Sequence, residues 1–204
     1  MRSALTRSFT AGSVPTVLSQ RCLAASASGQ FALFNGFEVR ATLQGNRVER
    51  DELLRVLSAF EDERLEYILI GATALALHGI VRATEDVDFF IRATADNVER
   101  LKRALRTVYA ADPSIDEIHA EDLLGEYPSV RYYPPTGDLY FDILTRLGEA
   151  ARYEDVAVET KIVAGIRVRV ATPRALYDLK KGTVRALDRQ DAEALRQRFD
   201  LEDG

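Results

Sequence analysis

Two aspartates, Asp86 and Asp88, stand two residues apart at the start of an apolar run that continues to Ile91. Side chains at positions i and i+2 of a strand point to the same face, so a strand here would hold both carboxylates close together. Like charges at short range are costly unless a cation neutralises them or one carboxyl keeps its proton. Mg²⁺ prefers oxygen ligands and commonly shares a few carboxylates with substrate phosphates. The pair therefore predicts a Mg²⁺ site, although acidic pairs also occur on surfaces that bind no metal.

A third acid, Asp142, lies inside the apolar run from Leu139 to Leu144. An unpaired carboxylate is expensive to bury, so this side chain needs a partner. One interpretation is an ion pair with a buried arginine such as Arg131. The other is that Asp142 joins Asp86 and Asp88 at the same ions, because two-metal phosphoryl transfer requires a further carboxylate. We expect the second arrangement.

Gly71 separates a short apolar run, residues 67–70, from a helix expected at residues 72–78. Backbone N–H groups at such a junction can bind a phosphate. An ordinary strand-to-helix turn uses the same residue, so the glycine alone leaves both interpretations open.

Composition limits the remaining chemistry. The chain has 204 residues, of which 47% are hydrophobic, and its 27 basic and 32 acidic residues give a net charge of −5. A general basic coat for nucleic acid is therefore excluded, although a local basic patch is not. One cysteine and two histidines rule out a disulfide framework and argue strongly against a zinc site. No apolar run reaches the ~20 residues that span a membrane. We expect a soluble cytoplasmic protein that works with carboxylates, lysine, arginine and backbone.

The first 37 residues differ from the rest of the chain. No acidic residue precedes Glu38, and serine and arginine are frequent before it. We predict that residues 1–37 are a disordered segment. The same composition resembles an organellar transit peptide, so an organelle is the alternative location if residues 1–30 are one.

Periodicity and turn signals predict mixed helices and strands over the remainder. Helices are expected at residues 49–63, 72–78, 94–108, 115–124, 173–183 and 188–199, and strands at 67–70, 86–91, 130–133, 139–144, 156–163 and 166–170. This order indicates an α+β, or α/β-like, fold with a mixed sheet flanked by helices. We expect a core over residues 38–171 and a short helical part, residues 172–204, packed on it.

The order of strand, Gly71, Asp86-Val87-Asp88 and a later strand aspartate resembles the nucleotidyltransferase superfamily related to polymerase β. The stretch His78-Gly79-x-x-Arg82-x-Thr84-x-Asp86-x-Asp88 is similar to its small bacterial AbiEii/AbiGii toxin-type branch. The resemblance covers about residues 48–200.

The C-terminal region adds a third motif. Lys180 precedes Asp191 by eleven residues, and Asp188-x-x-Asp191 is similar to the end of that branch's last motif. One departure stands out: the family usually has Gly-Gly or Gly-Ser where this chain has Gly71-Ala72. Ala72 keeps its backbone N–H but lacks a hydroxyl for phosphate.

The resemblance implies a polymerase β-like nucleotidyltransferase fold and transfer of NMP from an NTP to a hydroxyl, with release of pyrophosphate. It implies that Asp86 and Asp88 bind two Mg²⁺ ions and that Asp142 either ligates the ion that activates the hydroxyl or helps to take its proton. The nucleotide-binding residues that it implies are Gly71, Ala72, Arg82, Lys180 and Asp191.

The resemblance also implies a toxin of a toxin–antitoxin system, with tRNA or another RNA as acceptor and a cognate antitoxin. A protein side chain or a small molecule such as an aminoglycoside is the alternative acceptor, and a non-catalytic antitoxin-like module is a third interpretation. Two basic clusters could receive an RNA backbone or be ordinary solvated faces. These clusters are Arg100, Lys102, Arg103 and Arg106, and Arg185, Arg189, Arg196 and Arg198.

Overall fold

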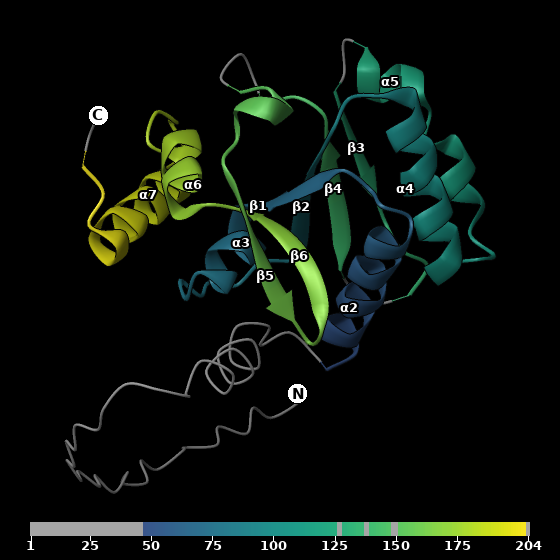
Figure 1. The fold of residues 1–204 in the computed structure, drawn as a ribbon, viewed down its shortest axis with the longest axis horizontal. Helices are drawn as coiled ribbons and strands as arrows, with labels where there is room; N and C mark the ends of the chain where they lie inside the picture. Colours follow the sequence, from purple (N-terminus) through teal and green to yellow (C-terminus); the bar gives the residue numbers. More distant parts are fainter. Residues whose placement is uncertain (1–46, 126–127, 137–138, 148–150, 203–204) are drawn as a thin grey trace, which may run out of the picture.

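A six-stranded sheet forms the centre of the protein (Figure 1). The computed structural model describes residues 47–125, 128–136, 139–147 and 151–202, so the predicted N-terminal segment, residues 1–37, lies outside the described part. The strands are β1 (Tyr67–Ile70), β2 (Asp86–Ile91), β3 (Ser129–Tyr132), β4 (Tyr140–Leu144), β5 (Val158–Val163) and β6 (Ile166–Ala171). Their order across the sheet is β3-β4-β2-β1-β6-β5.

Parallel and antiparallel pairs are mixed in this sheet. β2 runs antiparallel to β1 and parallel to β4, β1 runs parallel to β6, and β3 and β5 add antiparallel edges. The predicted mixed sheet is confirmed. The parallel pair of β2 and β4 has a direct consequence, because acids placed near the start of each strand meet at the same end of the sheet.

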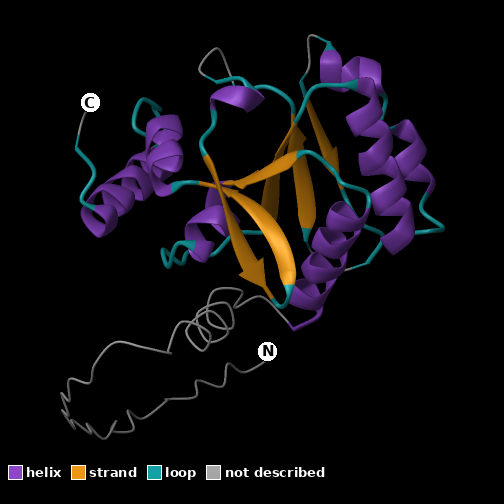
Figure 2. Ribbon diagram, in the orientation of Figure 1, coloured by secondary structure: helices purple, strands orange, loops and turns teal. Residues whose placement is uncertain are grey.

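Helices flank the sheet on two sides (Figure 2). They are α2 (Arg47–Asp62), α3 (Gly71–Leu77), α4 (Ala95–Val108), α5 (Ala120–Leu124), α6 (Pro173–Lys180) and α7 (Ala186–Phe199), with 3-10 turns at Pro113–Glu117 and Tyr153–Asp155. α2 packs on β6 and α4, whereas α6 and α7 pack on each other and reach the sheet region through α3. The C-terminal helices thus stand beside the end of the sheet where β1 gives way to α3.

The strand that carries two of the acids is anchored in an aromatic core. Phe89 of β2, Phe60 of α2 and Tyr67 of β1 form an edge-to-face triangle with ring centroids 5.0, 5.4 and 5.8 Å apart. Each such pair contributes ~0.5–1.5 kcal/mol beyond the burial of its surface. β2 alternates buried Val87 and Phe89 with partly exposed Asp86 and Asp88, so the core fixes the face on which the acids lie.

Two expected helices differ from the prediction by more than two residues at an end or by a break. The single helix predicted at residues 115–124 is divided into Pro113–Glu117 and Ala120–Leu124, because Ile118 has an extended backbone. The break lets Ile115, Ile118 and Leu123 all be buried in the core. The helix predicted at residues 173–183 ends at Lys180 instead.

Candidate active site

The register of the sheet brings the three acids together. Asp88 of β2 lies opposite Asp142 of β4, and Asp86 lies opposite Tyr140. Parallel strands in this register place Asp142 on the same face as the aspartate pair. Each of Asp86, Asp88 and Asp142 offers an oxygen within 4.8 Å of the other two.

Asp142 also has the arginine partner that the alternative interpretation required. Its Oδ1 accepts from Nε of Arg131 at 2.7 Å, and its Oδ2 accepts from Nη2 at 2.8 Å. The two interpretations of Asp142 are therefore not exclusive. The alternative named a buried arginine, and this detail was wrong, because the Arg131 side chain is 48% exposed on the edge strand β3.

The cluster is electrostatically strained without a cation. Burial, followed by the charges of Asp86 and Asp142, raises the pKa of Asp88 from 3.8 to about 6, although Lys180 and Arg82 act in the opposite direction. Three carboxylate oxygens at short mutual distance match the ligand preference of Mg²⁺, and a divalent ion would remove the repulsion. The donor set therefore fits the predicted metal.

This strain predicts a pH-dependent stability. The folded protein keeps the Asp88 proton up to about pH 6, whereas the unfolded chain releases it near 3.8, so stability falls as the pH rises between these values. We expect Asp88→Asn to raise the melting temperature in EDTA, by a difference that grows from about pH 4.5 to about pH 7 and reaches a few degrees. Thermal unfolding of both proteins measures it. A difference that is constant with pH would contradict the strain, and Mg²⁺ should shrink the difference near neutral pH.

Gly71 is shaped to admit the carboxylate of Asp88. Its φ is +66°, a left-handed conformation that side chains disfavour, and a methyl group at this position would lie 1.8 Å from Oδ2 of Asp88. Gly71 follows Ile70, which lies opposite Asp88 in the sheet. The glycine is therefore required for the acidic cluster whether or not a phosphate also approaches it.

Replacing Gly71 by alanine should displace Asp88. The left-handed backbone costs ~1 kcal/mol for alanine, and the methyl group also overlaps the carboxylate. We expect a lower melting temperature and Mn²⁺ binding weakened by at least about ten-fold, since cation sites depend on ligand geometry. Gly165→Ala is the matched control, because it has φ +88° and open space around its Cα. Equal Mn²⁺ affinity in the two variants would contradict the proposed contact.

A cleft of about 1040 Å³ opens above two of the acids. Its walls come from the β1–α3 junction, residues 82–86, β4 and the α6–α7 region. Its lining includes Gly71, Arg82, Thr84, Asp86, Asp88, Tyr140, Arg146, Lys180 and Arg185. Of the sequence-predicted nucleotide-binding residues, Gly71, Arg82 and Lys180 thus face the cleft, whereas Ala72 and Asp191 are buried at 1% and 4% exposure.

Asp191 holds the two predicted cations of the cleft. Nζ of Lys180 lies 2.9 Å from Oδ2 of Asp191 and 2.7 Å from Oδ1 of Asp188. Nε of Arg82 lies 3.3 Å from Oδ1 of Asp191. The helical C-terminal part is therefore tied to the loop that precedes β2, and it delivers a lysine to the wall of the acidic cleft.

The site contains two further side chains, Thr84 and Tyr140, which the sequence did not assign to it. The hydroxyl of Thr84 donates to a carboxylate oxygen of Asp86, which orients that acid. Tyr140 lines the cleft opposite Asp86 in the sheet. Thr84 stood in the motif that resembles the toxin branch, whereas no sequence signal marked Tyr140.

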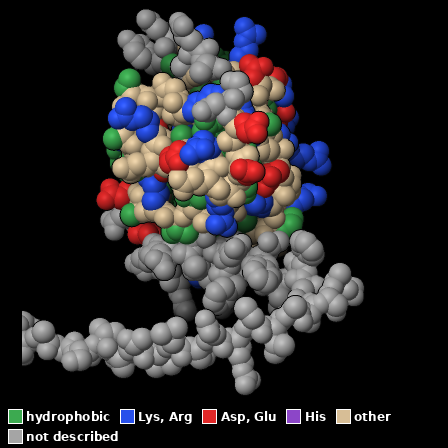
Figure 3. Space-filling model, turned by 90° about the vertical axis from the view of Figure 1, so that its left-hand side faces the viewer, with side chains coloured by type: hydrophobic (Ala, Val, Ile, Leu, Met, Phe, Trp, Pro, Cys, Tyr) green, Lys and Arg blue, Asp and Glu red, His purple; other side chains and the backbone are tan. Residues whose placement is uncertain are grey.

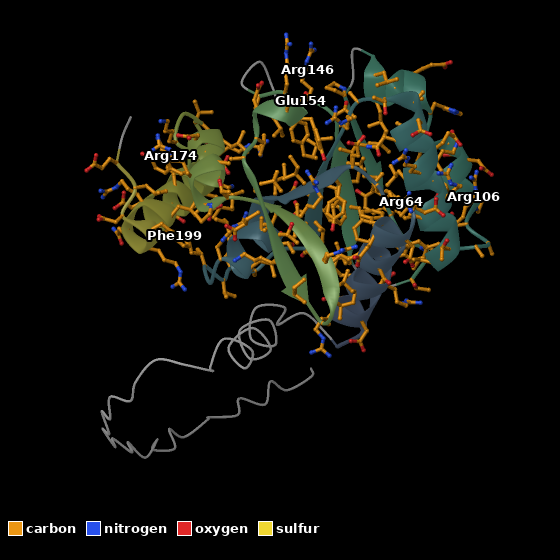
Figure 4. The ribbon with its side chains drawn as sticks, in the orientation of Figure 1. Arg64, Arg106, Arg146, Glu154, Arg174 and Phe199 are labelled. Carbon is orange, nitrogen blue, oxygen red and sulfur yellow. The ribbon has the colours of Figure 1, made fainter. Side chains whose placement is uncertain are left out.

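The basic cluster of α4 lies away from this cleft. Each of its cations contacts an acid: Arg100 with Asp96, Lys102 with Glu99, Arg103 with Glu63, and Arg106 with Asp116. Arg106 projects on the opposite side of the molecule from Arg174 and Phe199 of the C-terminal helices (Figure 4). On the visible part of the face that carries those helices, basic and acidic side chains are interspersed (Figure 3). The α4 cluster is thus an ion-paired surface.

The mixed sheet thus brings three carboxylates together, two of them in the lining of a cleft whose wall also carries a lysine from the C-terminal helices. Residues 53–201 match the family described as nucleotidyl transferase AbiEii toxin, Type IV TA (toxin–antitoxin) system, and the chain belongs to this family. The predicted resemblance is confirmed. A search of curated proteins found no match. None of the described helices has the length and apolarity to cross a membrane.

Proposed function

We propose that the protein is a Mg²⁺-dependent nucleotidyltransferase that transfers NMP from an NTP to a hydroxyl of RNA, with tRNA as the expected acceptor. The observation that supports this most strongly is the convergence of Asp86, Asp88 and Asp142 beside a cleft whose wall carries Lys180. Membership of a toxin family supports a toxic activity, a cytoplasmic location and a cognate antitoxin.

Each side chain has a role in this proposal. Asp86 and Asp88 would hold two Mg²⁺ ions, with Asp142 as the third ligand. When bound, the ions supply positive charge at the phosphates and orient the reacting oxygens. Lys180 and Arg82 stabilise negative charge on the triphosphate from the cleft wall, and Asp191 holds both cations in place.

In the proposed reaction one bond to the α-phosphorus forms and another breaks. The acceptor hydroxyl oxygen forms a bond to the α-phosphorus, and the bond to the bridging oxygen breaks, so pyrophosphate leaves with its electron pair. In this proposal Asp142 accepts the hydroxyl proton or orients the hydroxyl. Gly71 and the backbone N–H of Ala72 are proposed phosphate contacts at the start of α3.

The size of the cleft supports a second substrate beside the nucleotide. Pockets for one small ligand commonly measure ~300–1,000 Å³, and this cleft, with about 1040 Å³, is slightly larger. Arg146 and Arg185 add cations to its lining. We propose that residues 38–171 form the core that holds the acids, and that residues 172–204 complete the cleft.

Label transfer tests this function. The protein is incubated with each α-phosphate-labelled NTP, with total RNA or a protein extract, in Mg²⁺ or in EDTA. We expect Mg²⁺-dependent label in RNA, absent with Asp86→Asn. Label confined to protein or to a small molecule would overturn the RNA acceptor and would keep the chemistry.

A non-catalytic binding module is the second candidate. Two observations favour it: Lys180 is already paired with Asp188 and Asp191, and Ala72 offers no hydroxyl. A thermal shift with NTP separates the candidates. The enzyme should be stabilised only when Mg²⁺ is present and only with Asp86 intact, whereas the module should show no such shift.

A further inference from the structure

Arg131 distinguishes one of the three acids from the other two. In the described part of the chain, no lysine or arginine forms an ion pair with Asp86 or Asp88. Arg131, in contrast, donates a hydrogen bond to each carboxylate oxygen of Asp142. The contact follows from the register of the sheet. Arg131 of β3 lies directly opposite Asp142 of β4, and Asp142 lies opposite Asp88 of β2. The row of carboxylates therefore ends in a guanidinium.

Arg131 is held from a second direction by the strand that carries Asp142. Its guanidinium carbon lies 4.6 Å from the ring centroid of Tyr140, two residues before Asp142 and on the same face of β4. Bidentate pairing and aromatic stacking together fix a guanidinium in a way that a lysine cannot reproduce. Its hydrogen bond to Asp142 raises the pKa of Arg131, so the group stays charged.

The position of Arg131 separates it from the cations of the cleft. Arg82, Arg146, Lys180 and Arg185 line the cleft, whereas Arg131 and Asp142 lie outside its lining, directly opposite each other on β3 and β4. Two hydrogen bonds use one acceptor site on each oxygen of Asp142 and leave others for a cation or a hydroxyl. Arg131 can therefore keep both hydrogen bonds to Asp142 while Asp142 binds a cation or a hydroxyl.

We propose that Arg131 is a positioning residue with two separable effects, and this rests on the proposed function. Its bidentate geometry fixes the carboxylate plane of Asp142 for catalysis. Its charge neutralises part of the acidic cluster and so weakens cation binding before the nucleotide arrives. Loss of Arg131 should consequently tighten metal binding while slowing turnover, a combination that a purely structural ion pair would not produce.

Two substitutions separate charge from geometry. Arg131→Gln removes both, and Arg131→Lys keeps the charge but cannot form the paired hydrogen bonds. Arg103→Gln is the matched control, because Arg103 is 49% exposed and its Nε lies 2.7 Å from Glu63, on the side of α4. The Arg131 side chain is similarly 48% exposed, and its Nε lies 2.7 Å from Oδ1 of Asp142.

Mn²⁺ binding without nucleotide, followed by electron paramagnetic resonance, is the readout that does not depend on activity. We expect Arg131→Gln to bind Mn²⁺ about three-fold or more tightly than the native protein, and Arg131→Lys and Arg103→Gln to stay within about two-fold. Unchanged or weaker binding in Arg131→Gln would overturn the charge effect. This result stands even if no acceptor is found.

Kinetics test the geometric effect. Both Arg131 variants should lower kcat by about ten- to a hundred-fold, as for residues that orient metal ligands, with KM for NTP changed less than about three-fold. In an Asp142→Asn background, Arg131→Gln should add less than about two-fold. A raised KM with unchanged kcat would mean that Arg131 contacts the nucleotide, and either that result or a full effect without Asp142 would overturn the proposal.

Discussion

Asp86→Asn is expected to reduce nucleotidyl transfer by at least about a thousand-fold while leaving the fold intact. The amide keeps the size of the side chain and can still contact Thr84, but it removes one of the three anionic ligands of the cluster. Removal of a like charge also relieves repulsion on Asp88. The melting temperature in EDTA should therefore stay equal to that of the native protein or rise, and label transfer measures the loss.

Asp51→Asn provides the control for this experiment. Asp51 is a 58% exposed aspartate of α2 that contacts Arg50 and is not among the residues that line the cleft. Its substitution should leave both transfer and the Mg²⁺-dependent thermal shift within about two-fold, as expected for an exposed ion pair. An Asp86→Asn protein that retains a tenth of the native activity would show that the cluster is not the catalytic centre.

The acidic pair itself could be predicted from local sequence. Asp86 and Asp88 precede buried Phe89 and Phe90, and a strand with this alternation has only one way to orient its polar face. The hypothesis that Asp142 joins them needed an assumption about strand order, because no local pattern reveals which strands pair. Here β4 aligns in parallel with β2, and that alignment alone makes the row of acids.

The roles of Gly71 and Arg131 could not be predicted, because they depend on contacts between segments that are distant in the sequence. Gly71 was interpreted as a turn or a phosphate site, since the sequence does not show that Asp88 packs against its Cα. Arg131 was considered as a buried partner, and only the edge position of β3 explains its exposure. In both cases the residue type was informative, but the role depended on a neighbour that the register of the sheet supplies.

Lys180 has a structural and a proposed catalytic role that substitution can separate. Its side chain is 11% exposed and neutralises Asp188 and Asp191, which are 18% and 5% exposed. Removal of one partner from a buried ion pair costs ~3–5 kcal/mol, because the remaining charges stay desolvated. Lys180→Met should therefore lower the melting temperature by roughly ten degrees for a domain of this size, measured by thermal unfolding.

The double variant Lys180→Met/Asp188→Asn decides between the two roles, because it also neutralises Asp188, which otherwise loses its ion pair with Lys180, whereas Asp191 keeps its ion pair with Arg82. It should regain most of the lost stability, since well-packed neutral groups replace buried ion pairs at little cost. If Lys180 also contacts the triphosphate, Mg²⁺-dependent NTP binding stays weakened by about ten-fold or more in this variant. Lys181→Met is the control, because Lys181 is 37% exposed and pairs with Asp178, and it should change neither property. Recovery of both stability and NTP affinity in the double variant would restrict Lys180 to holding the C-terminal helices against the cleft.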